Sequence, residues 1–511
     1  MSEESTGSNQ KQPPRLHNHL IWLLPFVLLL FGLGLRLVDL TDPPFDFHPT
    51  RQLRAAIIAR GMYYEMLPSA DPTVREQASQ LRIMLKSYEP QLFERLVALT
   101  YLAAGGEYLW IARLFAILFW CGGGWFLFDL ARRMVSWGGG MTALAFYLLL
   151  PLTISASRSF QPDPLVTFWI LVSLWMAYRW SQLRTWRWAV ATGLVAGLTL
   201  LIKVTAVFFL APAVILLVID MWGMRQALRR WEVWLAAGLA ALIPASYYIA
   251  QLGSYSVGYF EFWTGSFYNL WFEPSFYIQW LKILDRLFNL ALLVAGLIGV
   301  ASFQARGPRN ALLGMWLGYG LYGLCFPFQI RSHEYYSLMF VPVVALSLAP
   351  LGKLLLETLH RKPIFWRLVA AAALLIGVAY PVWITYTGLI GVNYAGEAAA
   401  WTKMGRELPK EGQILALTHD YGVRIGYYGW RFVHLWPGTE EFSMLSMRAS
   451  SSGEESADFE QQFLTETQDM DYFLVTRFDQ LEAQPLLKDR LYDQYPVIAQ
   501  GDGYILFDLK P

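Results

Sequence analysis

Long apolar runs alternate with short polar segments from residue 20 to residue 388. An apolar run of about 20 residues is long enough to cross the hydrocarbon core of a bilayer as a helix. The runs predict eleven transmembrane helices at residues 20–38, 108–130, 138–157, 163–180, 187–202, 204–222, 232–250, 286–303, 310–328, 336–356 and 365–388. Residues 1–19 are polar and contain no small-residue cleavage site, so we interpret the first run as an uncleaved span.

Two segments between the spans are too long to be simple connectors. The first, residues 39–107, contains a helical stretch at 51–66 and an amphipathic stretch at 90–104. We expect its apolar faces to lie on the bilayer surface. The second, residues 251–285, is rich in Tyr, Phe and Trp, a composition typical of the membrane interface.

After residue 388 short β-like runs alternate with helical ones, which is typical of a small α/β domain. The β-like runs are residues 414–417, 432–436, 472–476, 497–499 and 504–507. The pattern thus predicts three parts: an N-terminal tail (1–19), a transmembrane domain (20–388) and a soluble domain (389–511).

Composition supports a membrane protein and excludes several other classes. The chain is 55% hydrophobic and 15% charged, against about 25% charged in soluble proteins. Its formal net charge is +1, and we expect no nucleic-acid partner. Cys121 and Cys325 both lie in apolar runs, so neither a disulfide framework nor a Cys-based metal site is indicated. The chain also contains no Gly-rich phosphate-binding loop, and ATP-driven transport has no support.

Basic residues predict the orientation of the spans. Every loop that is cytoplasmic when the N-terminus is cytoplasmic contains at least two Lys or Arg, as the positive-inside rule requires. These residues are Arg132, Arg133, Arg179, Arg184, Arg187, Arg225, Arg229, Arg230, Arg306, Arg309, Arg361, Lys362 and Arg367. We therefore expect the soluble domain to lie outside the cytoplasm, in a protein of the plasma (inner) membrane.

Ionisable and polar residues gather at the predicted outer ends of the spans, where such groups are costly and are candidates for function. They are Asp46, His48, Arg51, Arg54, Lys86 and Glu89 in the first outer segment, Arg158, Gln161 and Asp163 after the third span, Lys203 after the fifth, and Arg331, His333, Glu334, Tyr335 and Tyr336 after the ninth. A carboxylate or imidazole can deprotonate an acceptor hydroxyl, and cations can stabilise a departing phosphate. The mixture suits group transfer from a lipid phosphate.

Structural explanations compete with several of these functional ones. Asp163 between two prolines could cap the fourth span, although capping does not explain Arg158 and Gln161 beside it. Lys203 could extend its amine to the interface, and Glu89-Pro90 could simply start a helix.

The arrangement resembles the GT-C glycosyltransferases, and within them the protein O-mannosyltransferase and aminoarabinose transferase group. The similar patches include Arg54-Ala-Ala-Ile-Ile-Ala-Arg60-Gly-Met62, Glu89-Pro90-Gln-Leu, Pro162-Asp163, Gly197-Leu-Thr-Leu-Leu-Ile-Lys203 and residues 333–342. The resemblance implies a polytopic α-helical membrane fold of GT-C type with about 11 transmembrane helices and a C-terminal extracytoplasmic α/β domain.

The chain departs from that group at two functional positions. An Asp-Glu pair at the head of the first-loop helix is replaced by Arg51-Gln52, and a Lys-Pro-Pro phosphate contact aligns on Glu89-Pro90-Gln91. We expect Asp46 to replace the missing catalytic carboxylate, with His48 as its partner or as the alternative base. Lys86, Arg51 or Arg54 would then supply the missing charge.

The resemblance implies a hexosyl or pentosyl transferase that moves a sugar from a polyprenyl-phosphate donor to an extracytoplasmic acceptor, by a single displacement with inversion. Asp46, His48 and Asp163 are the predicted catalytic residues, and the other outer polar residues would bind the sugar and the lipid phosphate. We expect no required cofactor; a divalent cation near Asp46, His48 and Asp163 is the alternative. The rival functions are a lipid or solute transporter, or flippase, without transferase activity, and a catalytically silent scaffold.

Overall fold

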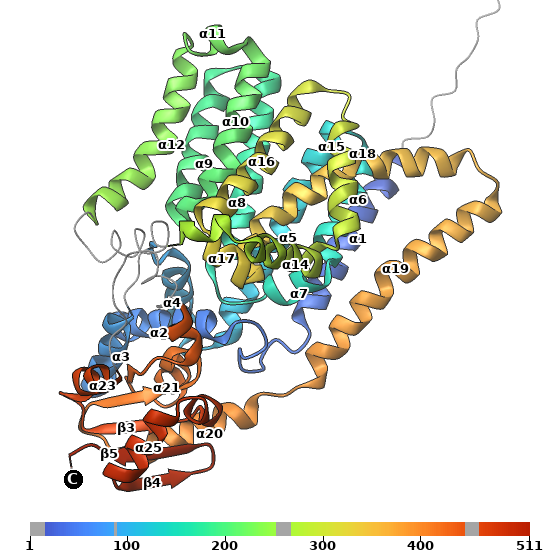
Figure 1. The fold of residues 1–511 in the computed structure, drawn as a ribbon. Coiled ribbons are helices and arrows are strands. Elements are labelled where there is room, and N and C mark those ends of the chain that lie inside the picture. The colour runs from blue at the N-terminus through green and yellow to red at the C-terminus, as the bar shows by residue number, and fades with distance from the viewer. Residues whose placement is uncertain (1–15, 86–88, 252–266, 445–458, 511) are drawn as a thin grey trace, which may run out of the picture.

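A helical bundle lies above two smaller layers, namely the helices of the first outer segment and a C-terminal α/β part (Figure 1). The computed structural model describes the chain apart from residues 1–15, 86–88, 252–266, 445–458 and 511. The long helices of the bundle are α1 (Leu16–Leu37), α5 (Leu109–Met134), α6 (Trp137–Leu149), α8 (Pro162–Leu183), α9 (Trp186–Ile202), α10 (Val207–Trp222), α12 (Trp231–Ala250), α15 (Leu290–Ala301), α16 (Arg306–Cys325), α18 (Val341–His360) and α19 (Ile364–Gly391).

Further helical elements connect these helices or extend their ends. They are α7 (Pro151–Ala156), η1 (Val204–Ala206), α11 (Met224–Ala227), η2 (Tyr268–Phe272), α14 (Pro274–Phe288), α17 (Pro327–Ser332) and η3 (Glu334–Phe340). Glycines let some bundle helices approach closely, as small residues do in membrane proteins. A Cβ atom at Gly318 of α16 would lie 1.7 Å from the carbonyl oxygen of Phe208 on α10, so a larger residue there would push the two helices apart.

All eleven predicted spans fall on helices, but not all of these helices are long enough to cross a membrane by themselves. By length and composition, five described helices are long and apolar enough, or six if α14 and α15, which meet at a bend of 85°, form one span. The helix α9, for example, has 17 residues. The number of spans therefore remains a prediction.

The helix α19 stands apart from the rest of the bundle and leads down to the C-terminal part (Figure 1). In its most apolar stretch of 18 residues, only 6% of the residues are buried inside the protein. In a membrane its side chains would therefore contact lipid on almost every side.

The first outer segment forms the helices α2 (Pro49–Met66), α3 (Pro72–Met84) and α4 (Leu92–Ala104). Asp71 caps α3 by accepting a hydrogen bond from the backbone N–H of Thr73 at 2.8 Å, which is the usual role of Asp at this position. Between residues 52 and 63 all side chains of α2 except Arg54 are buried. The prediction that these helices lie on the bilayer surface is therefore wrong for α2, which is covered by protein.

The C-terminal part contains a five-stranded sheet at the positions that the sequence predicts. The strands are β1 (Ile414–Leu417), β2 (His434–Leu435), β3 (Tyr472–Val475), β4 (Val497–Gly501) and β5 (Tyr504–Asp508), in the order β2-β1-β3-β5-β4. The strand β1 is parallel to β2 and β3, whereas β5 is antiparallel to β3 and β4. The helical elements are α20 (Ala395–Glu407), η4 (His419–Gly422), α21 (Val423–Tyr428), α23 (Phe459–Thr467), α24 (Phe478–Glu482) and α25 (Pro485–Gln494).

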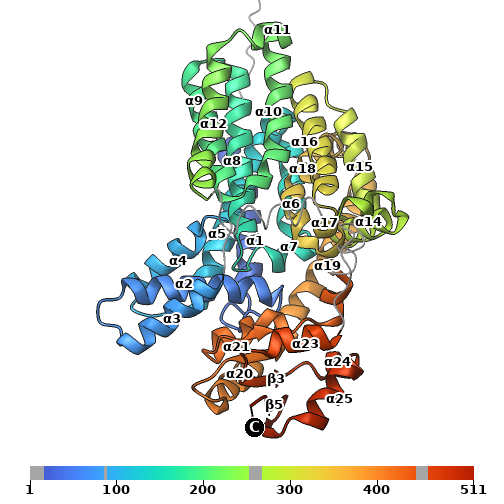
Figure 2. The same cartoon turned by 60° about the vertical axis from the view of Figure 1, so that its left-hand side comes forward.

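The C-terminal part is docked on the first outer segment beneath the bundle (Figures 1 and 2). Arg60 on α2 donates a 2.6 Å hydrogen bond to the carbonyl oxygen of Tyr427 on α21. The backbone N–H of Tyr394 donates to Asp42 at 3.0 Å, and Thr50 donates to Asp420 at 2.8 Å. The two layers form a single outer body.

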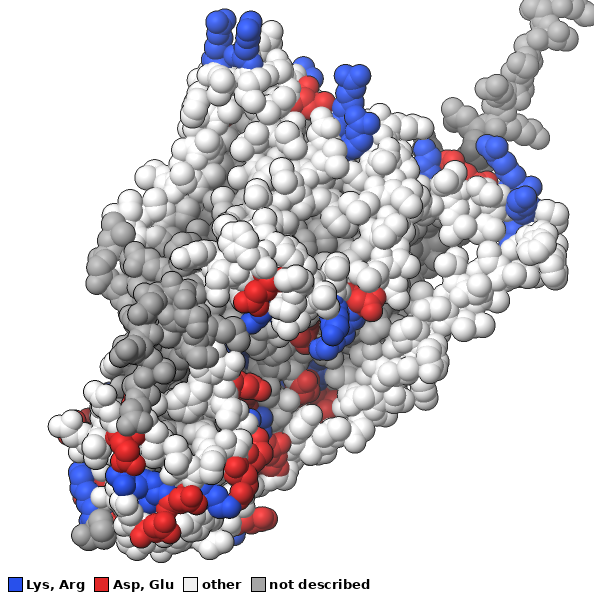
Figure 3. Space-filling view, in the orientation of Figure 1, with Lys and Arg blue, Asp and Glu red and all other residues white. Residues whose placement is uncertain are grey.

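The two ends of the molecule differ in the charge of their side chains. Lys and Arg gather at the end that carries α11, and charges of both signs cover the visible face of the C-terminal part (Figure 3). Most of the visible surface of the upper bundle between them is uncharged. Such a distribution is typical of a membrane protein. It is consistent with the orientation predicted from the sequence.

Candidate active site

A left-handed residue directly before α2 brings the first outer segment into contact with the end of the bundle. His48 has φ 46° and ψ 68°, a region in which His is found more often than most other non-glycine residues. Pro49 follows in the first turn of α2, where its missing N–H is not needed. The turn places Asp46, His48 and Arg51 around the start of one helix.

Asp163 lies at the centre of a buried ion-pair network in the first turn of α8. Its side chain is 0% exposed, and Oδ1 accepts a hydrogen bond from Nζ of Lys203 at 2.8 Å. Its Oδ2 lies 3.5 Å from a terminal nitrogen of Arg51. The N-cap residue of α8 is Gln161, so capping does not explain Asp163. One carboxylate shared by two cations leaves a net positive charge.

His48 and Glu334 form a second pair beside this network. Nε2 of His48 lies 3.3 Å from Oε1 of Glu334, which is 286 residues away in the chain. The Tyr335 ring lies between the two groups of interactions: its centroid is 4.6 Å from that of His48 and 4.4 Å from Cζ of Arg51. The stacking of a guanidinium on an aromatic ring is a favourable cation–π contact.

Asp46 has a different cationic partner. Its Oδ1 lies 3.0 Å from a terminal nitrogen of Arg113 on α5, and the Arg113 side chain is 2% exposed. Arg113 also donates a 3.2 Å hydrogen bond to the carbonyl oxygen of Leu40. The two predicted carboxylates, Asp46 and Asp163, are therefore neutralised separately.

Arg158 and Gln161 are buried under the loop that follows the first span. Arg158 donates a 2.5 Å hydrogen bond to the carbonyl oxygen of Asp39, and Gln161 donates one of 2.6 Å to Oγ of Ser159. Burial and the neighbouring Arg113 lower the pKa of Arg158 to about 10. Arg158 thus supports the loop, whereas Gln161 bonds within its own turn, and the contact of both side chains with substrate remains a prediction.

Glu89 and Arg54 lie within electrostatic range of the Asp163 network. Burial raises the pKa of Glu89, while Lys203, Arg51 and, more weakly, Arg54 act in the opposite direction. The predicted contact Lys86 lies outside the described residues.

Of the residues 331–336, Arg331 points to a different partner from the rest. Its guanidinium lies 4.0 Å from the carboxylate of Glu273. Nδ1 of His333 lies 2.8 Å from Oγ of Ser332, and burial together with nearby His48 lowers the pKa of His333 to about 4. Cζ of Arg51 lies 5.9 Å from the ring centroid of Tyr336. The two histidines and two tyrosines thus line the site together.

The sequence prediction missed two residues that the structure brings into this region. Arg113 is a buried cation near the start of an apolar helix, and that placement alone could have marked it as a candidate. Glu94 lies in the first turn of α4; burial and the like charge of Glu89 raise its pKa to about 7. Because α4 is amphipathic, a glutamate in its sequence is not unusual and did not mark Glu94 as a candidate for function.

The carboxylates of the predicted cation site are paired with cationic side chains. Among the described residues, no three His, Cys, Asp or Glu side chains come together as a metal site would require. Asp163 forms ion pairs with Lys203 and Arg51, and Asp46 forms one with Arg113. A cation at Asp46, His48 and Asp163 would have to displace these partners.

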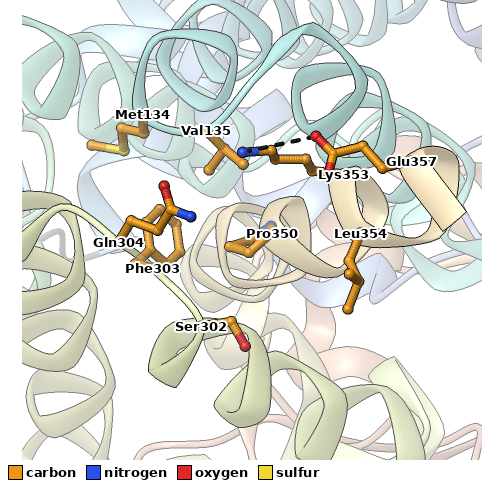
Figure 4. A pocket seen from close by; sticks show the side chains of 9 residues that line it. All are labelled: Met134, Val135, Ser302, Phe303, Gln304, Pro350, Lys353, Leu354 and Glu357. Carbon is orange, nitrogen blue, oxygen red and sulfur yellow. Dashed lines mark ion pairs between the residues drawn. The ribbon is translucent and has the colours of Figure 1, made fainter.

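A cavity of about 190 Å³ lies at the opposite end of α18 (Figure 4). Its lining includes Lys353 and Glu357, whose charged atoms are 3.9 Å apart, together with Met134 and Gln304. None of the predicted site residues lines it. The predicted site therefore does not depend on this cavity.

Comparisons with known proteins identify the fold. Residues 90–249 match the family model described as dolichyl-phosphate-mannose-protein mannosyltransferase. ArnT from Cupriavidus metallidurans bound to undecaprenyl phosphate is 14% identical, with 96% of this chain and 98% of that chain covered and a TM-score of 0.57. The archaeal oligosaccharyltransferase AglB from Archaeoglobus fulgidus, in complex with an inhibitory peptide and a dolichol-phosphate, is 14% identical, with 92% and 70% covered and a TM-score of 0.61.

The arabinofuranosyltransferase AftD from Mycobacteria is also similar, at 14% identity, with 95% of this chain and 41% of that chain covered and a TM-score of 0.51. A comparison with curated protein sequences finds no significant match. The three similar structures are GT-C glycosyltransferases. The fold class predicted from the sequence is thereby confirmed.

Proposed function

We propose that this chain, which has the GT-C fold, is a membrane glycosyltransferase that uses a sugar linked to a polyprenyl phosphate. The observation that carries the proposal is the convergence of Arg51, Lys203 and the His48–Glu334 pair at the outer end of the bundle. Cations and a base within one site are what the departure of a phosphate and the deprotonation of an acceptor require. The undecaprenyl phosphate bound to ArnT and the dolichol-phosphate bound to AglB support a lipid-borne donor.

The cations would bind the donor phosphate. Lys203 and Arg51 share one carboxylate, so the three groups together carry a net positive charge that would attract an anion, and Arg54 would contribute from the next turn of α2. Because Asp163 is 0% exposed, its role would be to position these two cations. We propose no step through a metal ion.

The reaction would be a single displacement with inversion at the anomeric carbon, on the extracytoplasmic side of the inner membrane. The acceptor hydroxyl would attack the sugar, and the polyprenyl phosphate would leave with the electron pair of the broken bond. Hexoses and pentoses are both candidate sugars, and the acceptor would be a lipid, a glycan or a protein of the cell envelope.

The test is an assay of the purified full-length chain with radiolabelled polyprenyl-phosphate hexoses and pentoses and with cell-envelope extract as acceptor. We expect labelled product together with free polyprenyl phosphate. Lys203→Gln should lower the rate at least 10-fold, because charge-assisted hydrogen bonds contribute about 1.5–3 kcal/mol. Lys353→Gln, which removes a paired lysine at the opposite end of the bundle, should leave the rate unchanged.

A transporter or flippase would move the labelled lipid across a vesicle membrane without releasing free lipid phosphate. A scaffold would do neither. Movement without release, or the absence of product with every donor in the panel, would contradict the proposed activity.

A further inference from the structure

Three side chains at the site could act as the base that takes a proton from the acceptor, and their surroundings distinguish them. The Asp163 side chain is 0% exposed and bound by Lys203. Asp46 is 19% exposed, but a guanidinium that is itself buried holds its carboxylate. Oδ1 of Asp46 already accepts hydrogen bonds from Arg113 at 3.0 Å and from Gln52 at 3.5 Å. His48 is 22% exposed and has a carboxylate, not a cation, as its hydrogen-bonding partner.

The contact between His48 and Glu334 has the form of a base held by an orienting acid. A carboxylate on one ring nitrogen fixes the proton on that nitrogen and leaves the other nitrogen free to accept a proton. Nε2 of His48 faces Glu334 at 3.3 Å, so Nδ1 is the atom left for an acceptor. The left-handed backbone of His48 costs energy in a non-glycine residue, and such residues cluster at functional sites.

The imidazole also lies close to a cation that would bind the phosphate. The centroid of the Tyr335 ring lies 4.6 Å from that of His48 and 4.4 Å from Cζ of Arg51, so the imidazole centre is at most about 9 Å from the guanidinium carbon. The base and this cation are therefore near enough to act on one bound substrate.

We propose that His48 is the catalytic base of the transfer and that Glu334 positions it; this rests on the function proposed above. Nδ1 of His48 takes the proton of the acceptor hydroxyl as the acceptor oxygen forms its bond to the anomeric carbon. The bond from that carbon to the phosphate oxygen breaks, and the polyprenyl phosphate leaves with the electron pair. Glu334 stabilises the imidazolium that results.

Other charged or titratable groups face the imidazole from the elements around it. They are His333, Glu334 and Tyr335 at the start of η3 and Arg51 on α2, with Asp46 two residues earlier in the chain. Because the pKa of His333 is lowered to about 4, this second imidazole is neutral above pH 5. A change in rate between pH 5 and 8 would therefore not come from His333, and the variants below separate His48 from Glu94, whose pKa is raised to about 7.

The test compares the pH dependence of kcat/KM in the parent and in two variants, with the donor that gives product in the assay above. His48→Asn preserves the backbone, since Asn tolerates the left-handed region, but it cannot act as a base. We expect it to lose about 10² to 10⁴ in rate and to lose the decline at acid pH. In Glu334→Gln the imidazolium loses the carboxylate beside it, so that decline should move to lower pH, with a rate at least 10-fold lower.

Two comparisons separate this proposal from its alternatives. His434→Asn, the same substitution at a histidine of β2, should behave as the parent, and melting temperatures in detergent should show that each variant is folded. Retention of more than a tenth of the rate by His48→Asn, or an unchanged pH profile in Glu334→Gln, would overturn the assignment. Loss of the acid decline in Asp46→Asn instead would make Asp46 the base. A parent enzyme without product would contradict the proposed function itself.

Discussion

At the scale of single residues, Arg51 is the side chain whose role the structure changes most. The resemblance to the O-mannosyltransferase group implies a carboxylate at this position, and the structure shows Arg51 bound to Asp163 and stacked on Tyr335. Arginine can make these contacts because its guanidinium is planar and offers donors in a fixed geometry.

Arg51→Lys should keep the charge and lose much of the activity. The ammonium of Lys can neither stack on Tyr335 nor bind a phosphate through two parallel hydrogen bonds, and we expect kcat/KM for the donor to fall about 10- to 100-fold. The alternative is that Arg51 anchors the loop to anionic lipid head groups, an interaction that does not distinguish Lys from Arg. Steady-state kinetics of Arg51→Lys distinguish the two roles. If turnover matches that of the parent and the KM for the donor is unchanged, Arg51 anchors the loop and does not bind the donor phosphate.

Glu94 should make the stability of the protein depend on pH. Its pKa is raised from 4.5 to about 7, so the folded chain binds a proton that the unfolded chain has lost between these values. Stability should therefore fall as the pH rises from 4.5 to 7. With about 1.4 kcal/mol for each pKa unit and a half-buried side chain, the loss should be on the order of 2 kcal/mol.

Thermal unfolding in detergent from pH 4.5 to 8 measures this effect. Glu94→Gln should remove most of the decline, whereas Glu76→Gln, at an exposed glutamate of α3, should not. An equal slope in the parent and in Glu94→Gln would mean that another group titrates.

At the scale of elements, α2 joins the C-terminal part to the site. Its residue Arg60 is 5% exposed. The guanidinium lies 3.0 Å from the carboxylate of Glu107 and 3.9 Å from the ring centroid of Tyr427. Thr50, which lies on the same helix two residues after His48, donates a hydrogen bond to Asp420. A change in the docking of the C-terminal part would therefore reach the start of α2 and the site.

Arg60→Met should loosen this docking. Removal of one partner from a buried ion pair costs about 3–5 kcal/mol, and we expect faster protease cleavage in the linker at residues 392–394. Arg82→Met, which breaks a more exposed pair with Glu65, should change stability by no more than about 1 kcal/mol. Equal cleavage rates in the two variants would contradict the role of Arg60 in docking.

At the scale of the whole molecule, the site lies at the end of the bundle that also carries the C-terminal part, opposite the basic end seen in Figure 3. The positive-inside rule predicts that the basic end faces the cytoplasm. Lipid-borne sugars suit a site on the other side, where nucleotide sugars are scarce.

A fusion of alkaline phosphatase after residue 389 should therefore be active, and a fusion of green fluorescent protein at the same position should be dark. The same two reporters after residue 229, next to α11, should give the opposite result. A reversal of both patterns would place the site in the cytoplasm and contradict a donor presented outside it.

The sequence by itself determined the helical bundle, the positions of the five strands and the types of residue at the outer end. These features follow from local signals, because an apolar run of sufficient length forms a helix wherever it lies, and alternating runs between turns form strands. The tertiary structure alone decided which charges meet. The structure pairs residues that lie 67 to 286 positions apart in the chain. These pairs are Arg51 with Asp163, Arg113 with Asp46, and His48 with Glu334. No local pattern encodes such pairings, because they arise only when the packed helices bring the ends of separate spans together.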